Sequence, residues 1–196
     1  MVASWISYNS LFVFAILISS CKMNAQINDV MIEYESGTNL DSILSKPIRA
    51  ELNSLTIQVS ENLNTWFSYG RIPLQEFEEL NNIPSFRIKK PLGNLPWLGG
   101  MDSLESLTIK FLGLTQLPLG INELKNLKKL DISFNYLNIS QEISIIKELE
   151  KLEELIVFGL KIDQSVILEL KETNKKLSVL HSQEQHLDYL KRINSK

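Results

Sequence analysis

One stretch of the chain, residues 117–137 (LPLGINELKNLKKLDISFNYL), changes its hydrophobic period partway along. Ile121, Leu124 and Leu127 recur every three residues, as on a helical turn. Leu130 and Ile132 then alternate with polar residues, as on a β-strand. One short unit therefore combines a return segment with a strand and a bend, and this pattern restricts the chain to folds built by repeating such units.

The unit does recur, which an ordinary strand followed by a helix would not do. Positions equivalent to Leu127, Leu130 and Ile132 carry aliphatic residues again 23 residues upstream and 25 residues downstream. Weaker copies lie further out on both sides. The sequence therefore predicts about six parallel strands, centred on Leu55, Phe86, Leu107, Leu130, Leu155 and Leu180.

Residues 48–187 resemble leucine-rich repeat proteins, especially short bacterial ones with the variant L-P-x-x-I-x-x-L-x-x-L found at 117–127. The resemblance implies an α/β leucine-rich repeat solenoid with a curved parallel sheet and a helical or irregular convex side. Asn135 occupies the position where a side-chain amide can both donate to and accept from backbone groups at the bend. The equivalent positions hold Pro91, Leu112 and Leu160, so we expect irregular turns.

Alternation along the predicted strands identifies side chains that face outward on the concave side. Burying Leu107 and Ile109, for example, directs Thr108 and Lys110 outward. One predicted column across the sheet runs through Gln58, Lys89, Lys110, Ser133 and Phe158. The candidate binding residues are Arg87, Lys89, Thr108, Lys110, Lys129, Asp131, Ile156 and Phe158. Exposed apolar residues on a sheet face often mark a contact, whereas lysines there can simply keep the face soluble.

The first 21 residues contain no Asp, Glu, Lys or Arg, and residues 11–18 form an unbroken apolar run. The run is too short to span a bilayer, which takes about 20 residues, but it suits a secretory signal peptide. Residues 18–21 (ISSC) resemble the lipobox of bacterial lipoproteins, in which the cysteine is lipidated. We therefore expect 1–21 to be a signal peptide and Cys21 to carry a lipid anchor in the cell envelope.

Two alternatives remain for the N-terminus. Cleavage near Ala25 would give a soluble periplasmic or secreted protein, and translation from Met23 would give a cytoplasmic one. We interpret residues 22–47 as a tether followed by a helical N-terminal cap, with a disordered tail up to about residue 38 as the alternative. We interpret the polar segment from Gln183 as a C-terminal cap with a frayed end, and we expect residues 188–196 to be a polar tail.

Two further segments carry predictions. Residues 60–71 lengthen the first repeat and contain Trp66, Phe67 and Tyr69, which suit either a binding loop or core packing. Residues 139–152 have a single apolar face and predict a convex helix, with Glu142 among its outward charges.

The sequence offers little for catalysis. Cys21 is the only cysteine, and His181 and His186 are five residues apart, a spacing that suits no common paired metal motif. No phosphate loop or nucleophile elbow is present, so we expect no enzyme activity, metal or cofactor. A net charge of −3 argues against a nucleic-acid partner.

The remaining interpretation is a non-catalytic module that recognises a protein or another macromolecule through its concave face. The alternative is a structural envelope scaffold or a solenoid that associates with itself.

Overall fold

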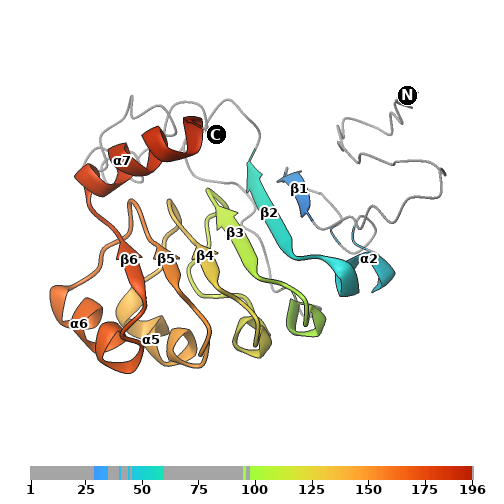
Figure 1. Cartoon of the computed structure of the whole chain (residues 1–196), viewed down its shortest axis with the longest axis horizontal. Coiled ribbons are helices and arrows are strands. Elements are labelled where there is room, and N and C mark those ends of the chain that lie inside the picture. The colour runs from blue at the N-terminus through green and yellow to red at the C-terminus, as the bar shows by residue number, and fades with distance from the viewer. Residues whose placement is uncertain are drawn as a thin grey trace.

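The computed structural model describes residues 29–34, 40, 44, 46–59, 95 and 98–195. These residues build one six-stranded sheet in the order β1-β2-β3-β4-β5-β6, and every neighbouring pair is parallel (Figure 1). The strands are β1 (Asp29–Tyr34), β2 (Ser54–Val59), β3 (Ser106–Lys110), β4 (Lys129–Asp131), β5 (Glu154–Ile156) and β6 (Ser178–Leu180). The strands follow one another in chain order and are all parallel, which confirms the predicted α/β leucine-rich repeat solenoid.

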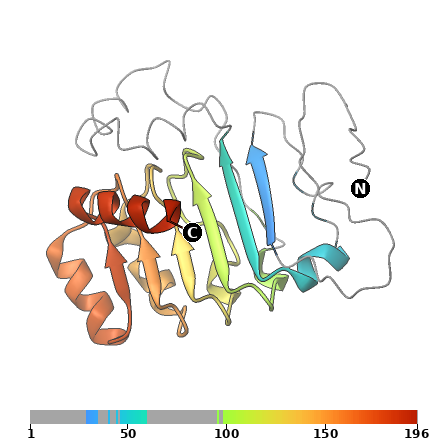
Figure 2. The ribbon, with the colours of Figure 1, turned by 45° about the horizontal axis from the view of Figure 1, so that its top comes forward.

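Helices lie on both sides of this sheet. The return segments contain two longer helices, α5 (Ile139–Lys147) and α6 (Gln164–Thr173), and two single turns, η2 (Leu98–Gly100) and η3 (Ile121–Glu123). A short helix, α2 (Lys46–Glu51), precedes β2. The last helix, α7 (Gln183–Asn194), crosses the opposite side from α5 and α6 (Figures 1 and 2). None of the helices described is long and apolar enough to cross a membrane.

The main core lies between the sheet and the return segments. Strand register aligns Leu55, Leu107, Leu130 and Leu155 in a single row, and all four are fully buried. Their neighbours in sequence point the other way, as alternation along a strand requires. The inward-facing residues of these four strands were therefore predicted correctly from the sequence.

The side chain of Asn135 ties two successive repeats together at the bend. Its Oδ1 accepts the backbone N–H groups of Leu112 and Leu114 at 3.0 and 3.2 Å. Its Nδ2 donates to the carbonyl oxygens of Ile109 and Ile132 at 2.8 and 2.9 Å. The predicted role of this buried amide, supplying partners to backbone groups that the strands no longer pair, is confirmed.

Two expectations about the N-terminal strands were wrong. Residues 29–34, which we assigned to a tether, form β1 and pair with β2 along their whole length. Strand β2 pairs directly with β3, with Gln58 beside Lys110, so no strand centred on Phe86 lies between them. Phe86 itself lies outside the described residues. The predicted column of concave residues therefore passes from Gln58 to Lys110 without Lys89.

The convex helix also differs from the prediction. It ends at Lys147 instead of continuing to residue 152, and Glu142, expected to face solvent, is 5% exposed. The Oε2 atom of Glu142 accepts the backbone N–H of Leu117 at 3.2 Å. Burial of this carboxylate supplies an acceptor to a turn of the preceding repeat, a need that helical periodicity alone does not reveal.

The polar residues from Gln183 form helix α7, which continues to Asn194 through the segment that we expected to be a frayed tail. A capping box opens the helix: Ser182 Oγ accepts the N–H of Gln185 at 3.2 Å, and Gln185 Oε1 accepts the N–H of Ser182 at 3.0 Å. These reciprocal hydrogen bonds fix the point at which the chain turns from β6 into α7.

Candidate functional site

Helix α7 divides the concave face into two parts (Figure 2). We define the open half as the outward side chains of β2 and β3, all of them half-buried: Ser54, Thr56, Gln58, Ser106, Thr108 and Lys110. We define the covered half as the outward side chains of β4, β5 and the residues just after them: Lys129, Asp131, Ser133, Glu154, Ile156 and Phe158. The two halves are continuous in register, because β3 pairs directly with β4.

Several candidate binding residues are buried in the covered half. Ile156 is 0% exposed, Phe158 2% and Asp131 3%. They do face the concave side, as alternation predicted, but the expectation that Ile156 and Phe158 form an exposed apolar contact surface was wrong. Rings of α7 pack over this part of the sheet. Because we predicted residues 188–196 to be a polar tail, we did not anticipate that a helix would cover these side chains.

An aromatic cluster fills the space between α7 and the sheet. The ring of His186 lies 4.6 Å from that of Phe158 and 5.6 Å from that of Phe134, measured between centroids. Tyr189 adds a third contact, 5.8 Å from Phe158. The centroid separations match ordinary aromatic packing, so the cluster forms a small second apolar core on the concave side.

The turns after β3 and β4 supply Phe134 of this cluster and Phe111, which stacks on it. Phe111, Phe134 and Gly159 occupy equivalent places and have positive φ angles of 58°, 57° and 70°. Positive φ is uncommon for a residue with a side chain, and a phenylalanine needs a compensating contact to hold it. Phe111 and Phe134 supply that contact to each other, stacked with centroids 4.5 Å apart and planes within 4°.

Charged groups link α7 to the starts of β4 and β5. Lys129 Nζ lies 3.0 Å from Glu154 and 3.2 Å from the hydroxyl of Tyr189, and Arg192 lies 2.8 Å from Glu154. The cations of Lys129 and Arg192 also lie 5.1 and 5.2 Å from the centre of the Tyr189 ring. The network holds one face of α7 to the sheet through the side chains of Tyr189 and Arg192.

The network sets the protonation of its members. Burial alone would raise the pKa of Glu154, but the hydrogen bonds from Arg192 and Lys129 lower it below the ordinary value. Burial likewise opposes the charge of Lys129, yet Tyr189 and Glu154 raise the pKa of that lysine. Burial raises the pKa of the Tyr189 hydroxyl. At neutral pH the covered half therefore contains a carboxylate paired with two cations.

His186 is the most enclosed polar residue of α7, at 3% exposed. Burial lowers the pKa of its imidazole; the charge of Asp131 opposes the shift and that of Lys110 adds to it. The ring makes no hydrogen bond with a residue in the described part of the chain. A neutral imidazole packed on phenylalanine rings is what this environment favours.

The open half contrasts with this arrangement. Its outward side chains are hydroxyls, an amide and one lysine, Lys110, which forms no salt bridge within the described residues. Because β1 pairs with β2, this surface extends onto β1, where Met31 lies beside Thr56 and is 59% exposed. Thr108 and Lys110 therefore remain accessible, as the sequence predicted, and they face the edge of the region that α7 covers.

Sequence reasoning missed the residues of α7 and of the turns. His186, Tyr189 and Arg192 recur every third position and therefore share one face of the helix. The capping signature of Ser182 and Gln185 was available as a signal for a helix. Other predictions lie outside the described residues: Arg87, Lys89, the aromatic residues of 60–71, and Cys21.

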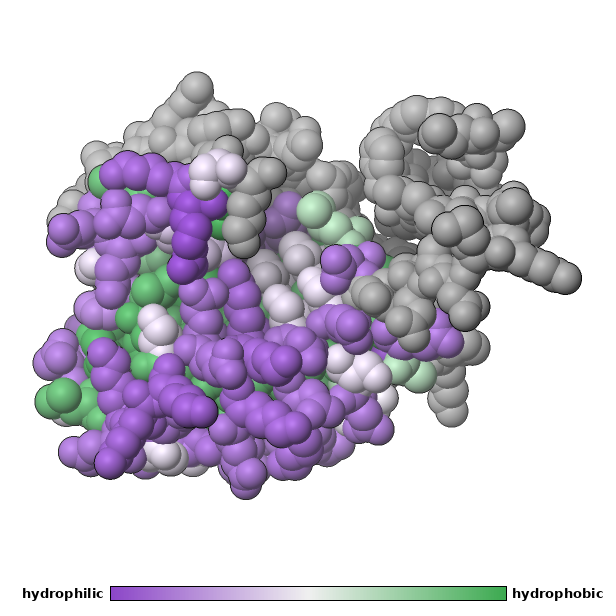
Figure 3. Space-filling model, viewed as in Figure 1, coloured by the Kyte–Doolittle hydropathy of each residue, from purple (hydrophilic) through white to green (hydrophobic). Residues whose placement is uncertain are grey.

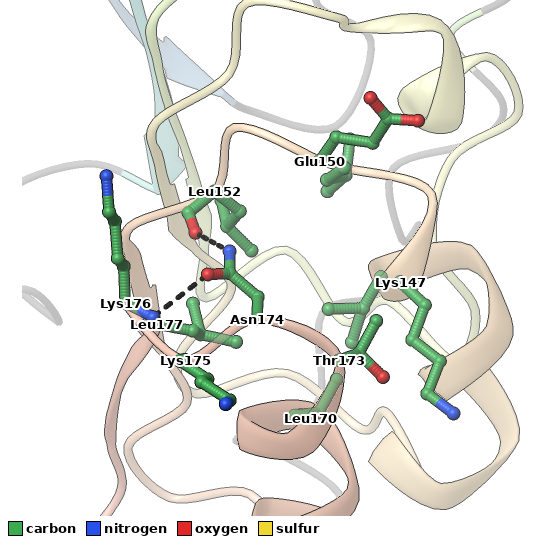
Figure 4. Close-up of a pocket in the computed structure, with 11 residues that line it drawn as sticks. Lys147, Glu150, Leu152, Leu170, Thr173, Asn174, Lys175, Lys176 and Leu177 are labelled. Atoms are coloured by element: carbon green, nitrogen blue, oxygen red, sulfur yellow. Dashed lines mark hydrogen bonds between the residues drawn. The ribbon is translucent and has the colours of Figure 1, made fainter.

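The convex side carries a hollow of about 470 Å³ between the ends of α5 and α6 (Figure 4). Asn174 bridges its wall, donating from Nδ2 to the carbonyl oxygen of Leu152 at 2.6 Å and accepting the N–H of Lys176 at 3.1 Å. Buried leucines line the bottom of the hollow, with Lys175 and Lys176 exposed beside them. The described residues contain no group of histidine, cysteine and carboxylate side chains able to hold a metal ion.

Comparisons with known proteins give a limited result. No protein-family model matches the chain, and no curated protein matches it. Among solved structures the chain is similar to a leucine-rich repeat protein of Leptospira interrogans, with a TM-score of 0.38 and 19% sequence identity. The match covers 66% of this chain and 31% of that one, so the chain spans about a third of that protein's length. The fold assignment rests on the sheet and its register.

Proposed function

We propose that this protein is a non-catalytic binding module that recognises a protein partner through the open half of its concave face. One observation carries the proposal: a continuous, half-exposed polar surface formed by aligned outward residues of β2 and β3. Repeats of this kind present such a surface along a rigid sheet, which suits an extended ligand. The buried leucine row behind it holds the backbone in place.

The chemistry of the open half favours a polar or acidic partner segment. Lys110 provides a positive charge without a salt bridge in the described part, and Thr108 and Ser106 provide hydroxyls that can donate and accept. Charge complementarity of this kind raises the association rate and selects against basic partners. The surface has no large apolar group except Met31, so polar contacts should dominate.

The test is a pull-down from envelope extract with matched charge reversals. Lys110→Glu should lower the amount of captured partner at least about tenfold, because it reverses the single cation of the open half. Lys175→Glu makes the same change on the convex side, where Lys175 is exposed beside the hollow (Figure 4), and should leave capture unchanged. Loss of capture with the convex variant alone would refute the concave-face assignment.

We also propose export and lipid anchoring at Cys21, supported by the apolar run of residues 11–18 and the ISSC sequence that ends it. Mass spectrometry of the mature protein should find an N-terminus at Cys21 that carries acyl chains. A chain that starts near Gln26 would indicate soluble export instead, and an unmodified chain starting at Met1 would exclude processing.

The alternative function, a self-associating scaffold, is favoured by one observation. Strand β1 pairs with β2 on one edge, and no described strand covers its other edge. Exposed edges of this kind allow strand pairing between chains. Light scattering across a hundredfold concentration range would detect association, and a constant monomer mass would reject it.

A further inference from the structure

We propose that α7 is a detachable cover, and that its release exposes a second binding surface for an amphipathic helix with aromatic and basic residues at the spacing found in α7. The inference rests on the proposed function in one respect, that the concave side of the sheet is the binding side. It adds a second surface to that side and an element of this chain that competes for it.

Helix α7 and the sheet meet through complementary chemical groups. Three residues of α7 at every third position, His186, Tyr189 and Arg192, meet aromatic and acidic groups of the sheet. The ring of Phe158 packs against His186 and Tyr189. Glu154 pairs with the guanidinium of Arg192 at 2.8 Å. This is the arrangement of a helix bound in a groove, where anchors one turn apart fill successive places.

The surface beneath α7 is separate from the main core. Leu130 and Leu155 belong to the main core, whereas Ile156 and Phe158 are buried outside it, on the other side of the same sheet. Phe158 belongs to the small aromatic cluster. Removing α7 therefore leaves the leucine rows intact. Figure 3 shows a mostly hydrophilic surface, with hydrophobic surface visible below α7 at the β6 end.

Helix α7 is held to the sheet by few buried side chains. Only His186 and Leu190 are buried among its described side chains, and the Arg192 side chain remains 55% exposed in its ion pair with Glu154. Solvent at Arg192 weakens this pair, although the Glu154 side chain is only 21% exposed, and the His186 ring is buried without a hydrogen bond from the described residues. Among the described residues, the helix meets the sheet side through the side chains of His186, Tyr189 and Arg192. Local opening needs few contacts to break.

Hydrogen exchange on the full chain tests the detachment. Arg192→Glu places a carboxylate beside Glu154 and should raise the exchange rate of α7 amides about tenfold, while β5 amides keep their rate. Lys191→Glu is the matched control, since the ion pair that Lys191 forms within the described residues lies inside α7, with Asp188 at 3.0 Å. Equal acceleration of α7 and β5, or no acceleration of either, would overturn the proposal.

A labelled synthetic peptide of residues 182–195 tests the second surface. A chain whose own cover is mostly open should bind this peptide more tightly than one whose cover is closed, in proportion to the open fraction. We expect the Arg192→Glu chain to bind it about tenfold more tightly than the unmodified chain or the Lys191→Glu chain. Adding Phe158→Ala to the Arg192→Glu chain should remove that gain.

Equal peptide binding by all the chains, or none by any, would overturn the second surface. Neither exchange nor peptide binding involves the natural partner. A failure here would leave the Lys110→Glu result standing, and a failure of the Lys110→Glu experiment would leave the peptide result standing.

Discussion

The two halves of the concave face follow one backbone plan but carry different chemistry. Thr108 in β3 aligns with Asp131 in β4 and Asp131 aligns with Ile156 in β5, so each occupies the same place in its repeat. Thr108 is half-exposed, whereas the other two are buried beneath α7. A shared repeat therefore fixes the direction of a side chain, while the identity of the outward residues determines whether another element packs on it.

The same contrast appears in how each half is stabilised. The open half has a single core, the leucine row behind the strands. The covered half has that row and, on its other side, the aromatic cluster around Phe158 with the ion pairs of Glu154. Changes to the leucine row should thus affect both halves alike, and changes to outward residues should separate them.

The largest effect should come from the leucine row. Leu130→Ala behind the covered half and Leu107→Ala behind the open half should each lower the free energy of unfolding by about 2 to 5 kcal/mol, because both side chains are fully buried. Urea denaturation measures both. A cost below about half a kcal/mol for either variant would show that the two halves do not share one core.

Outward residues should distinguish the halves. Phe158→Ala should lower the free energy of unfolding by about 3 kcal/mol, because it removes the ring on which His186 and Tyr189 pack. Thr108→Ala changes a half-exposed residue of the open half and should stay within about 0.5 kcal/mol. Similar costs for the two variants would contradict the division of the concave face.

A middle-sized effect is expected at the bend that joins the halves. Asn135→Ala leaves backbone groups at the end of β3 and just after β3 and β4 without their buried partner, at a cost of about 1 to 3 kcal/mol. Amide exchange at Leu112 and Leu114 should rise more than elsewhere, since both donate to Asn135. Unchanged exchange at these two amides would show that other acceptors replace the side chain.

The smallest effect should be a pH dependence confined to the covered half. Burial and Lys110 hold the pKa of His186 below the unfolded value of about 6.5, against the opposing charge of Asp131. A depressed histidine pKa contributes stability that is present above the unfolded pKa and is lost as the pH falls through the unfolded value toward the folded one. The free energy of unfolding should therefore decrease between pH 7 and pH 5.

A second histidine must be separated from this effect. Burial and the charge of Lys171 also lower the pKa of His181. His186→Phe should flatten the profile more than His181→Asn, because His186 is the more deeply buried of the two. Within this pH window Glu154 contributes little, since its lowered pKa moves its titration to more acidic pH. Equal flattening by both variants would reject a dominant role for His186.

The sequence was sufficient where one local pattern controls the structure. The leucine spacing located β2 to β6 and the inward residues of the first four of them, and the chemistry of an amide anticipated the hydrogen bonds of Asn135. In β6 the spacing was one residue off: we centred this strand on Leu180, but Val179 is the buried residue that aligns with Leu155. Strand β1 was missed although Val30 and Ile32 alternate with other residues, because the segment lacks the return half of a repeat. In that case alternation was the better guide.

The cover was missed for a different reason. Whether Ile156 and Phe158 are exposed depends on what the chain does more than 20 residues later, and no spacing within their own repeat records it. Phenylalanines at equivalent turn positions, Phe111 and Phe134, were a further hint that this side holds apolar residues. Contacts between distant segments made through a few side chains leave only weak traces in periodicity.

Direct pairing of β2 with β3 has a consequence for how this molecule tolerates change in length. Register between Ser54 and Ser106 is set by the two strands themselves, although residues 60–105 separate them in sequence. Closing a connection costs free energy that grows only slowly with its length, about 0.6 kcal/mol per doubling. The connection is thus a place where the chain can gain residues over evolution, or accept a grafted module, as long as the buried Leu98, Met101 and Leu104 near its end stay in place. The sheet on either side would keep its alignment.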